Sequence, residues 1–170
     1  MHLFENDYSL KFLNLSHCSF QYVDNIQHMF RNCYSLESID LSNLNTSNVQ
    51  TMNSMFENCR KLTSLNLSNF DTRKVRYMCN VFNNCTSLSS LIINFNTIYV
   101  QRMNYIFGSC TSLKTLNIST FRTDKMSGSD LNYMFENDYG LIIYINKKTC
   151  KNLISKLPEY VIAYDVNKSE

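Results

Sequence analysis

The sequence predicts an α/β solenoid whose units of about 26 residues each hold a short parallel strand and a short helix. One phrase recurs at a nearly constant interval, and the apolar period changes within each copy. A fixed period of about 20 to 50 residues indicates a solenoid, propeller or array. The phrase Met-Phe-x-Asn-Cys, or a variant of it, starts at Leu3, Met29, Met55, Val81, Ile106 and Met134.

The strand of each unit is predicted from alternation. In the third copy, Leu65 and Leu67 alternate with Ser64, Asn66 and Ser68. Alternating apolar and polar residues are typical of a strand with one buried and one solvated face. We therefore expect a strand of four or five residues in each unit.

The helix of each unit is predicted from a second spacing. After a polar turn, Val75, Met78, Cys79 and Phe82 follow one another at i, i+3, i+4 and i+7. This apolar stripe favours a helix of two to three turns. A single unit cannot bury its apolar face, but stacked units form one continuous core.

The two ends of the chain depart from the repeat. Residues 1–140 are predicted to form five to six stacked units and residues 141–170 a C-terminal cap. In this cap we expect a strand at 141–145, a helix at 147–157 and a strand at 160–166. No matching cap is predicted at the N-terminus, where truncation, a frayed first coil and self-association through an uncapped end stay open.

The cysteines follow the repeat. Because a column spreads its members along the solenoid axis, and because neither a C-x-x-C motif nor a His cluster is present, no metal site and no cofactor is predicted. We expect small buried side chains that satisfy or shield turn backbone groups, while disulfides between neighbouring units stay open. Cys18 aligns with Leu44 and Phe70 and is expected in the core. The shared position holds Cys33, Cys59, Cys85 and Cys110.

Composition and charge exclude several functions. Sixteen basic and fourteen acidic residues give a net charge of +2, too weak to indicate nucleic acid or an anionic membrane as partner. No apolar run reaches the roughly 18 residues of a membrane span, and no signal peptide is visible. The three histidines are scattered and no phosphate-binding loop is present, so we do not expect an enzyme.

The outward strand positions form the candidate binding face, a flat hydrogen-bonding surface suited to an extended partner. Solvated strand positions without a partner are the alternative. A row of turn threonines, Thr46, Thr72, Thr97 and Thr123, is expected instead to cap helices or to bond the backbone of the next coil. The first column of the face holds Phe12, Ser38, Ser64, Ser90 and Thr115, and the second holds Asn14, Asp40, Asn66, Ile92 and Asn117.

The unit running from Met55 to Met78 resembles the BspA-like leucine-rich repeat, including the variant of mycoplasma lipoprotein-associated surface proteins. The similarity covers residues 3–141 and implies a leucine-rich-repeat-like solenoid. Members are commonly surface proteins implicated in adhesion and protein binding. The resemblance therefore implies a protein-binding module of a surface or adhesin-type protein, with a protein or a glycan as partner.

The alternative is an intracellular scaffold for protein-protein interaction. We expect a location at the cell surface, or secretion, if the chain is part of a longer one, and a cytoplasmic location if Met1 is the true start.

Overall fold

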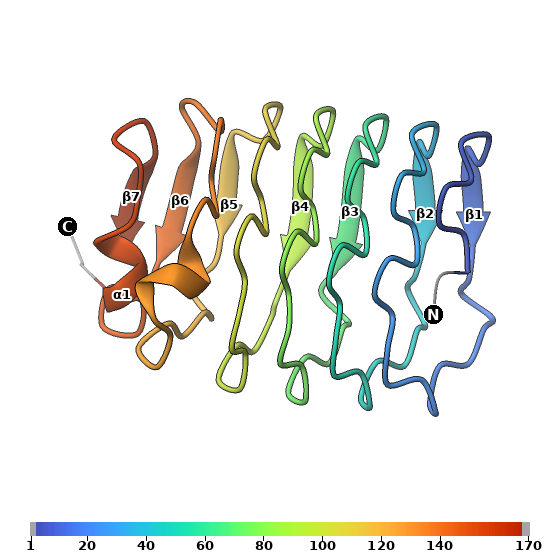
Figure 1. The fold of residues 1–170 in the computed structure, drawn as a ribbon, viewed down its shortest axis with the longest axis horizontal. Coiled ribbons are helices and arrows are strands. Elements are labelled where there is room, and N and C mark those ends of the chain that lie inside the picture. Colours follow the sequence, from blue (N-terminus) through green and yellow to red (C-terminus); the bar gives the residue numbers. More distant parts are fainter. Residues whose placement is uncertain (1–2, 168–170) are drawn as a thin grey trace.

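The computed structural model describes residues 3–167, so the predicted start of the first unit at Met1 lies outside the described residues. Seven short strands lie side by side in chain order (Figure 1). They are β1 (Phe12–Asn14), β2 (Ser38–Asp40), β3 (Ser64–Leu67), β4 (Ser90–Ile93), β5 (Thr115–Asn117), β6 (Ile142–Ile145) and β7 (Ile162–Asp165). We call the segments that start at the six copies of the phrase coils 1 to 6.

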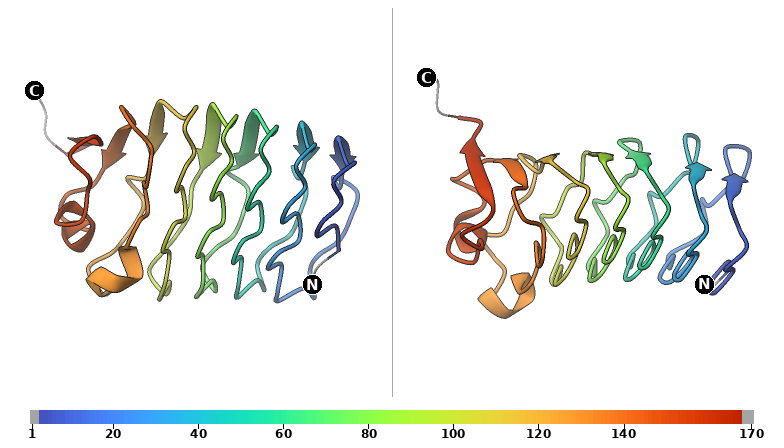
Figure 2. Two further views of the ribbon diagram at one scale, coloured as in Figure 1. Left: turned by 45° about the horizontal axis from the view of Figure 1, so that its top comes forward. Right: turned by 90° about the horizontal axis from the view of Figure 1, so that it is seen from above.

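Neighbouring strands pair in parallel, which makes the molecule a parallel β-solenoid. β1 pairs with β2, β3 with β4, and β5, β6 and β7 form a three-stranded sheet. A second parallel row of bridges joins Asn25 to Thr51, Thr51 to Tyr77, and Tyr77 to Arg102. Figure 2 shows the strands along one side of the stack and the connecting turns along the other.

The predicted helices of the repeat units are wrong. The segment 75–82 consists of turns and one bridge, because every second amide bonds the next coil instead of its own turn. The amides of Met78, Asn80 and Phe82 donate to carbonyl oxygens of the next coil, each at 2.9 Å. Asn80 also has a φ of 57°, in the left-handed region that interrupts an α-helix. Consecutive turns with inward side chains give the same apolar spacing as a helix.

Two further expectations are corrected. The predicted helix at 147–157 shrinks to α1 (Lys151–Ile154), four residues long. The expected core residue Cys18 is exposed, because Phe20, two positions later, is buried in the first coil instead. The insertion that lengthens the fifth unit forms the short 3-10 helix η1 (Gly128–Leu131).

A column of phenylalanines forms the centre of the core. The rings stack from coil to coil, with neighbouring centroids 5.3 to 6.0 Å apart. Stacked coils thus bury in common what no single coil could bury alone. The column holds Phe4, Phe30, Phe56, Phe82, Phe107 and Phe135, and all except Phe4 are buried.

Candidate functional site

The ten residues of the candidate face lie together on β1 to β5. The strand register places Phe12 opposite Ser38 and Ser64 opposite Ser90, so the first column is continuous within each pair. The second column follows the same register. Nine of the ten residues are exposed, and Asp40 is half-buried.

The second column also has a structural task. The side-chain oxygens of Asn14, Asp40, Asn66 and Asn117 each accept the backbone amide two residues later, at 2.8 to 3.0 Å. These hydrogen bonds form the turn that ends each strand. Hydrogen bonds from the amide and hydroxyl of Ser42 lower the pKa of Asp40. One acceptor of each side chain is therefore already occupied.

Four face residues escaped prediction. Ile142 and Ile162 continue the first column, and Tyr144 and Tyr164 continue the second. The two tyrosine rings stack with centroids 5.9 Å apart, and the exposed fraction of Tyr164 is 54%. The alternation at 142–145 was a signal, but these strands lie outside the repeated phrase. The face is thus polar at β2 and β3 and apolar toward β6 and β7.

A shallow depression of about 470 Å³ lies on this face where β4 and β5 meet. Ile92 and Tyr144 border it, and Thr115 and Asn117 lie between them on β5. Ile92 and Tyr144 belong to strands two places apart, or roughly 9.6 Å at ordinary strand spacing. The depression therefore has room for about one side chain. It coincides with the unit that lacks one residue, where the ladder is interrupted.

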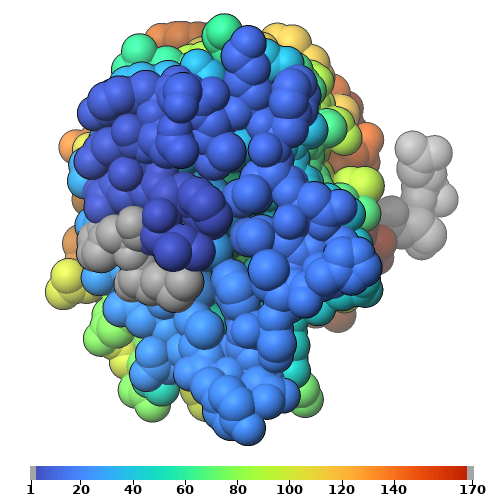
Figure 3. All heavy atoms as spheres, turned by 90° about the vertical axis from the view of Figure 1, so that its right-hand side faces the viewer, coloured from blue at the N-terminus to red at the C-terminus, as the bar shows by residue number. Residues whose placement is uncertain are grey.

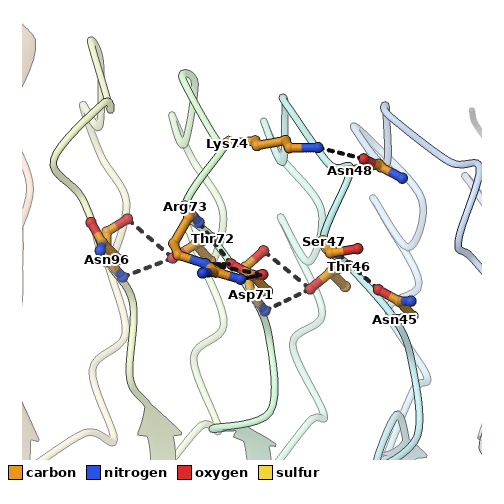
Figure 4. A network of polar contacts seen from close by, with 9 residues as sticks. All are labelled: Asn45, Thr46, Ser47, Asn48, Asp71, Thr72, Arg73, Lys74 and Asn96. Atoms are coloured by element: carbon orange, nitrogen blue, oxygen red, sulfur yellow. Dashed lines mark hydrogen bonds and ion pairs between the residues drawn. The ribbon is translucent and has the colours of Figure 1, made fainter.

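The threonine row is structural, as one of its two expected roles foresaw. The hydroxyl of Thr46 donates to the carbonyl of Asp71 and accepts the amide of the same residue, and Thr72 makes the same pair of bonds with Asn96 (Figure 4). The accepted amides lie at 2.8 Å in both cases. All four threonines are buried, so this row is excluded as a binding surface.

The cysteine column is also confirmed as a set of structural side chains. Each thiol donates to the carbonyl of a phenylalanine in the preceding coil, for example Cys59 to Phe30 at 3.2 Å and Cys85 to Phe56 at 3.1 Å. Burial raises the pKa of these thiols, to about 11 for Cys33. All seven cysteines are unpaired. Among residues 3–167, no three His, Cys, Asp or Glu residues are grouped so as to hold a metal ion.

The first coil forms the outer end of the described chain. Figure 3 looks onto this end, where atoms of the first coil form the outermost layer. Leu3, Tyr8 and Phe12 are exposed there, and Phe4 and Leu13 are partly buried. This end is therefore more apolar than the polar centre of the sheet face.

The fold and the face define a parallel β-solenoid repeat protein with a flat exposed sheet. The family described as "Mycoplasma protein of unknown function, DUF285" matches residues 1–88 and 59–157, and the chain belongs to this family. No curated protein and no solved structure matches the chain. Within the described residues, no helix is both long and apolar enough to cross a membrane.

Proposed function

We propose that this chain is a protein-binding module of the leucine-rich-repeat, BspA-like type in a surface or adhesin-type protein, and that the sheet face binds the partner. The observation that carries the proposal is the strand register, which gathers fourteen outward side chains on one exposed, nearly flat surface. Solenoids use such extended surfaces for binding. The surface location rests on the resemblance of the repeat unit to BspA-like repeats.

The composition of the face favours a protein over a glycan. Ile92, Tyr144 and Tyr164 are exposed large side chains of the kind that anchor protein interfaces. The side-chain oxygens of Asn66 and Asn117, which could accept from sugar hydroxyls, already accept backbone amides. An extended polypeptide could place one apolar side chain in the depression between Ile92 and Tyr144.

Affinity capture with matched variants tests the face. Ile92→Arg and Thr115→Arg place a charge at the depression without removing a turn-forming oxygen, so the fold should be kept. Tyr22→Arg is the control, because Tyr22 is 89% exposed and lies outside the strands. We expect a partner that the unmodified chain and Tyr22→Arg both retain and that the two face variants lose at least tenfold. Equal retention by all four proteins would remove the sheet face as the binding surface.

An intracellular scaffold is the second candidate, and the cysteines favour it. Five buried thiols act as hydrogen-bond donors to backbone carbonyls, a role that requires their reduced form. Reducing compartments keep thiols in this form. Protease treatment of intact cells distinguishes the candidates, since a surface protein is digested and an intracellular scaffold is protected.

Self-association through the first coil is a subsidiary proposal, supported by the exposed Leu3, Tyr8 and Phe12. Sedimentation over a hundredfold range of concentration should show a dimer that Phe12→Ser weakens. A monomer at every concentration would contradict it.

A further inference from the structure

We propose that Asp138 is held as a neutral carboxylic acid at the cysteine position of coil 6, and that loss of its proton loosens the C-terminal end of the solenoid. This proposal concerns a pH-sensitive junction and is independent of the proposed binding function. It rests on the place of Asp138 in the repeat, on its burial and on its missing hydrogen bonds.

Asp138 occupies the same backbone position as the column cysteines. Its amide donates to the carbonyl of Phe135 and its carbonyl accepts from Leu141, as those of Cys110 do with Phe107 and Leu113. The thiol of Cys110 in turn donates to Phe82 of the preceding coil at 3.1 Å. By the same step along the column, the acceptor available to Asp138 is the carbonyl of Phe107.

The environment suits a neutral acid and not a carboxylate. Asp138 is 1% exposed, and neither of its carboxyl oxygens has a hydrogen-bond partner. An unpaired buried carboxylate is strongly disfavoured, whereas a protonated carboxyl can donate as the thiols do. Burial raises the pKa of Asp138 to about 7, against a smaller lowering by the backbone of Cys110.

The ionisable groups around Asp138 leave its charge uncompensated. Cys110 lies beneath it in coil 5, and Glu136 lies on its own turn. Lys156 and Tyr160, from the segment that follows β6, line the groove beside this turn. Among the described residues, none of these four groups forms an ion pair or a hydrogen bond with the carboxyl group of Asp138.

The turn that carries Asp138 is attached to the last segment of the chain by few bonds. The amide of Gly140 donates to the carbonyl of Tyr160 at 3.1 Å, and the amide of Asn137 to the hydroxyl of Tyr160 at 3.2 Å. A groove of about 470 Å³ already separates parts of the two segments. Hydration of a charged Asp138 therefore requires only that these two contacts open.

The direction of the pH effect follows from proton linkage. The folded form binds the proton of Asp138 more tightly than the unfolded form, whose carboxyl titrates near its ordinary value. The stability contributed by this proton is therefore full at acid pH and is lost as pH rises through about 7. Most aspartates with hydrogen-bond partners behave in the opposite way.

Amide hydrogen exchange on the whole chain tests the proposal. We expect protection of Ile143 and neighbouring β6 amides, corrected for intrinsic exchange, to fall by roughly 30- to 100-fold from pH 5 to pH 8. Asp138→Asn and Asp138→Cys can donate without titrating in this range and should abolish the fall. Asp7→Asn is the matched control, because Asp7 holds the same repeat position but accepts the amides of Ser9 and Leu10.

An equal fall in Asp138→Asn, or protection that increases with pH, would overturn the proposal. A measurement without any substitution complements it: titration of the Asp138 carboxyl carbon by NMR should give a midpoint near 7. A midpoint near 4 would show that the carboxylate is solvated in the folded chain and would equally refute the inference.

Discussion

The middle coils and the C-terminal end share a backbone path but are held together differently. In the middle coils, the same cysteine, threonine and asparagine bonds recur every 24 to 29 residues. At the end, β6 and β7 are offset by only 20 residues, Asp138 replaces the cysteine, and Thr123 accepts one amide at 3.3 Å. Strand pairing alone continues the fold, whereas the repeated side-chain bonds stabilise its centre.

The largest expected effect comes from the aromatic column in the middle coils. Phe56→Ala removes a fully buried ring that stacks on Phe30 at 5.3 Å and on Phe82 at 6.0 Å. We expect it to lower the free energy of unfolding by about 3 to 5 kcal/mol in denaturant titrations. Tyr22→Ala, at an 89% exposed side chain, is the control and should change it by less than about 0.5 kcal/mol. A similar small effect of both would mean that the column is not the core.

The threonine row gives a sharper comparison, because Thr→Val keeps the shape and removes only the hydroxyl. Thr72→Val leaves both the amide and the carbonyl of Asn96 without this partner. We expect a loss of about 1 to 3 kcal/mol in the free energy of unfolding. Thr123→Val removes a single longer bond from Leu153 and should cost less than half as much. Equal losses would show that the end of the chain is as dependent on this row as the middle.

The sequence predicted those features that repeat. The period, the strand positions and the inward cysteines follow from residues that recur in register, since stacking gives each the same surroundings. The helices were mispredicted because Met78 and Phe82 point inward from consecutive turns. The asparagines at positive φ, Asn80 and Asn84, were the overlooked signal. Tyr144 and Asp138 lie where the repeat fails, so their surroundings depend on long-range packing that no period describes.

The smallest expected effect concerns a ladder of asparagines along the turn edge. The amide nitrogen of Asn58 donates to Asn32 and its oxygen accepts from Asn84, each at 2.7 Å. Because Asn58 has a φ of 64°, Asn58→Gly removes the ladder bonds without adding backbone strain. We expect a loss of about 1 kcal/mol in the free energy of unfolding. Asn137→Gly, at the end of the chain, has the same φ of 64° but removes one exposed bond to Ser109 at 3.2 Å and a bond of half that worth. If Asn137→Gly were the more damaging of the two, the ladder would not distinguish the middle coils from the end, and the shortened last segment would depend on side-chain bonds as much as they do.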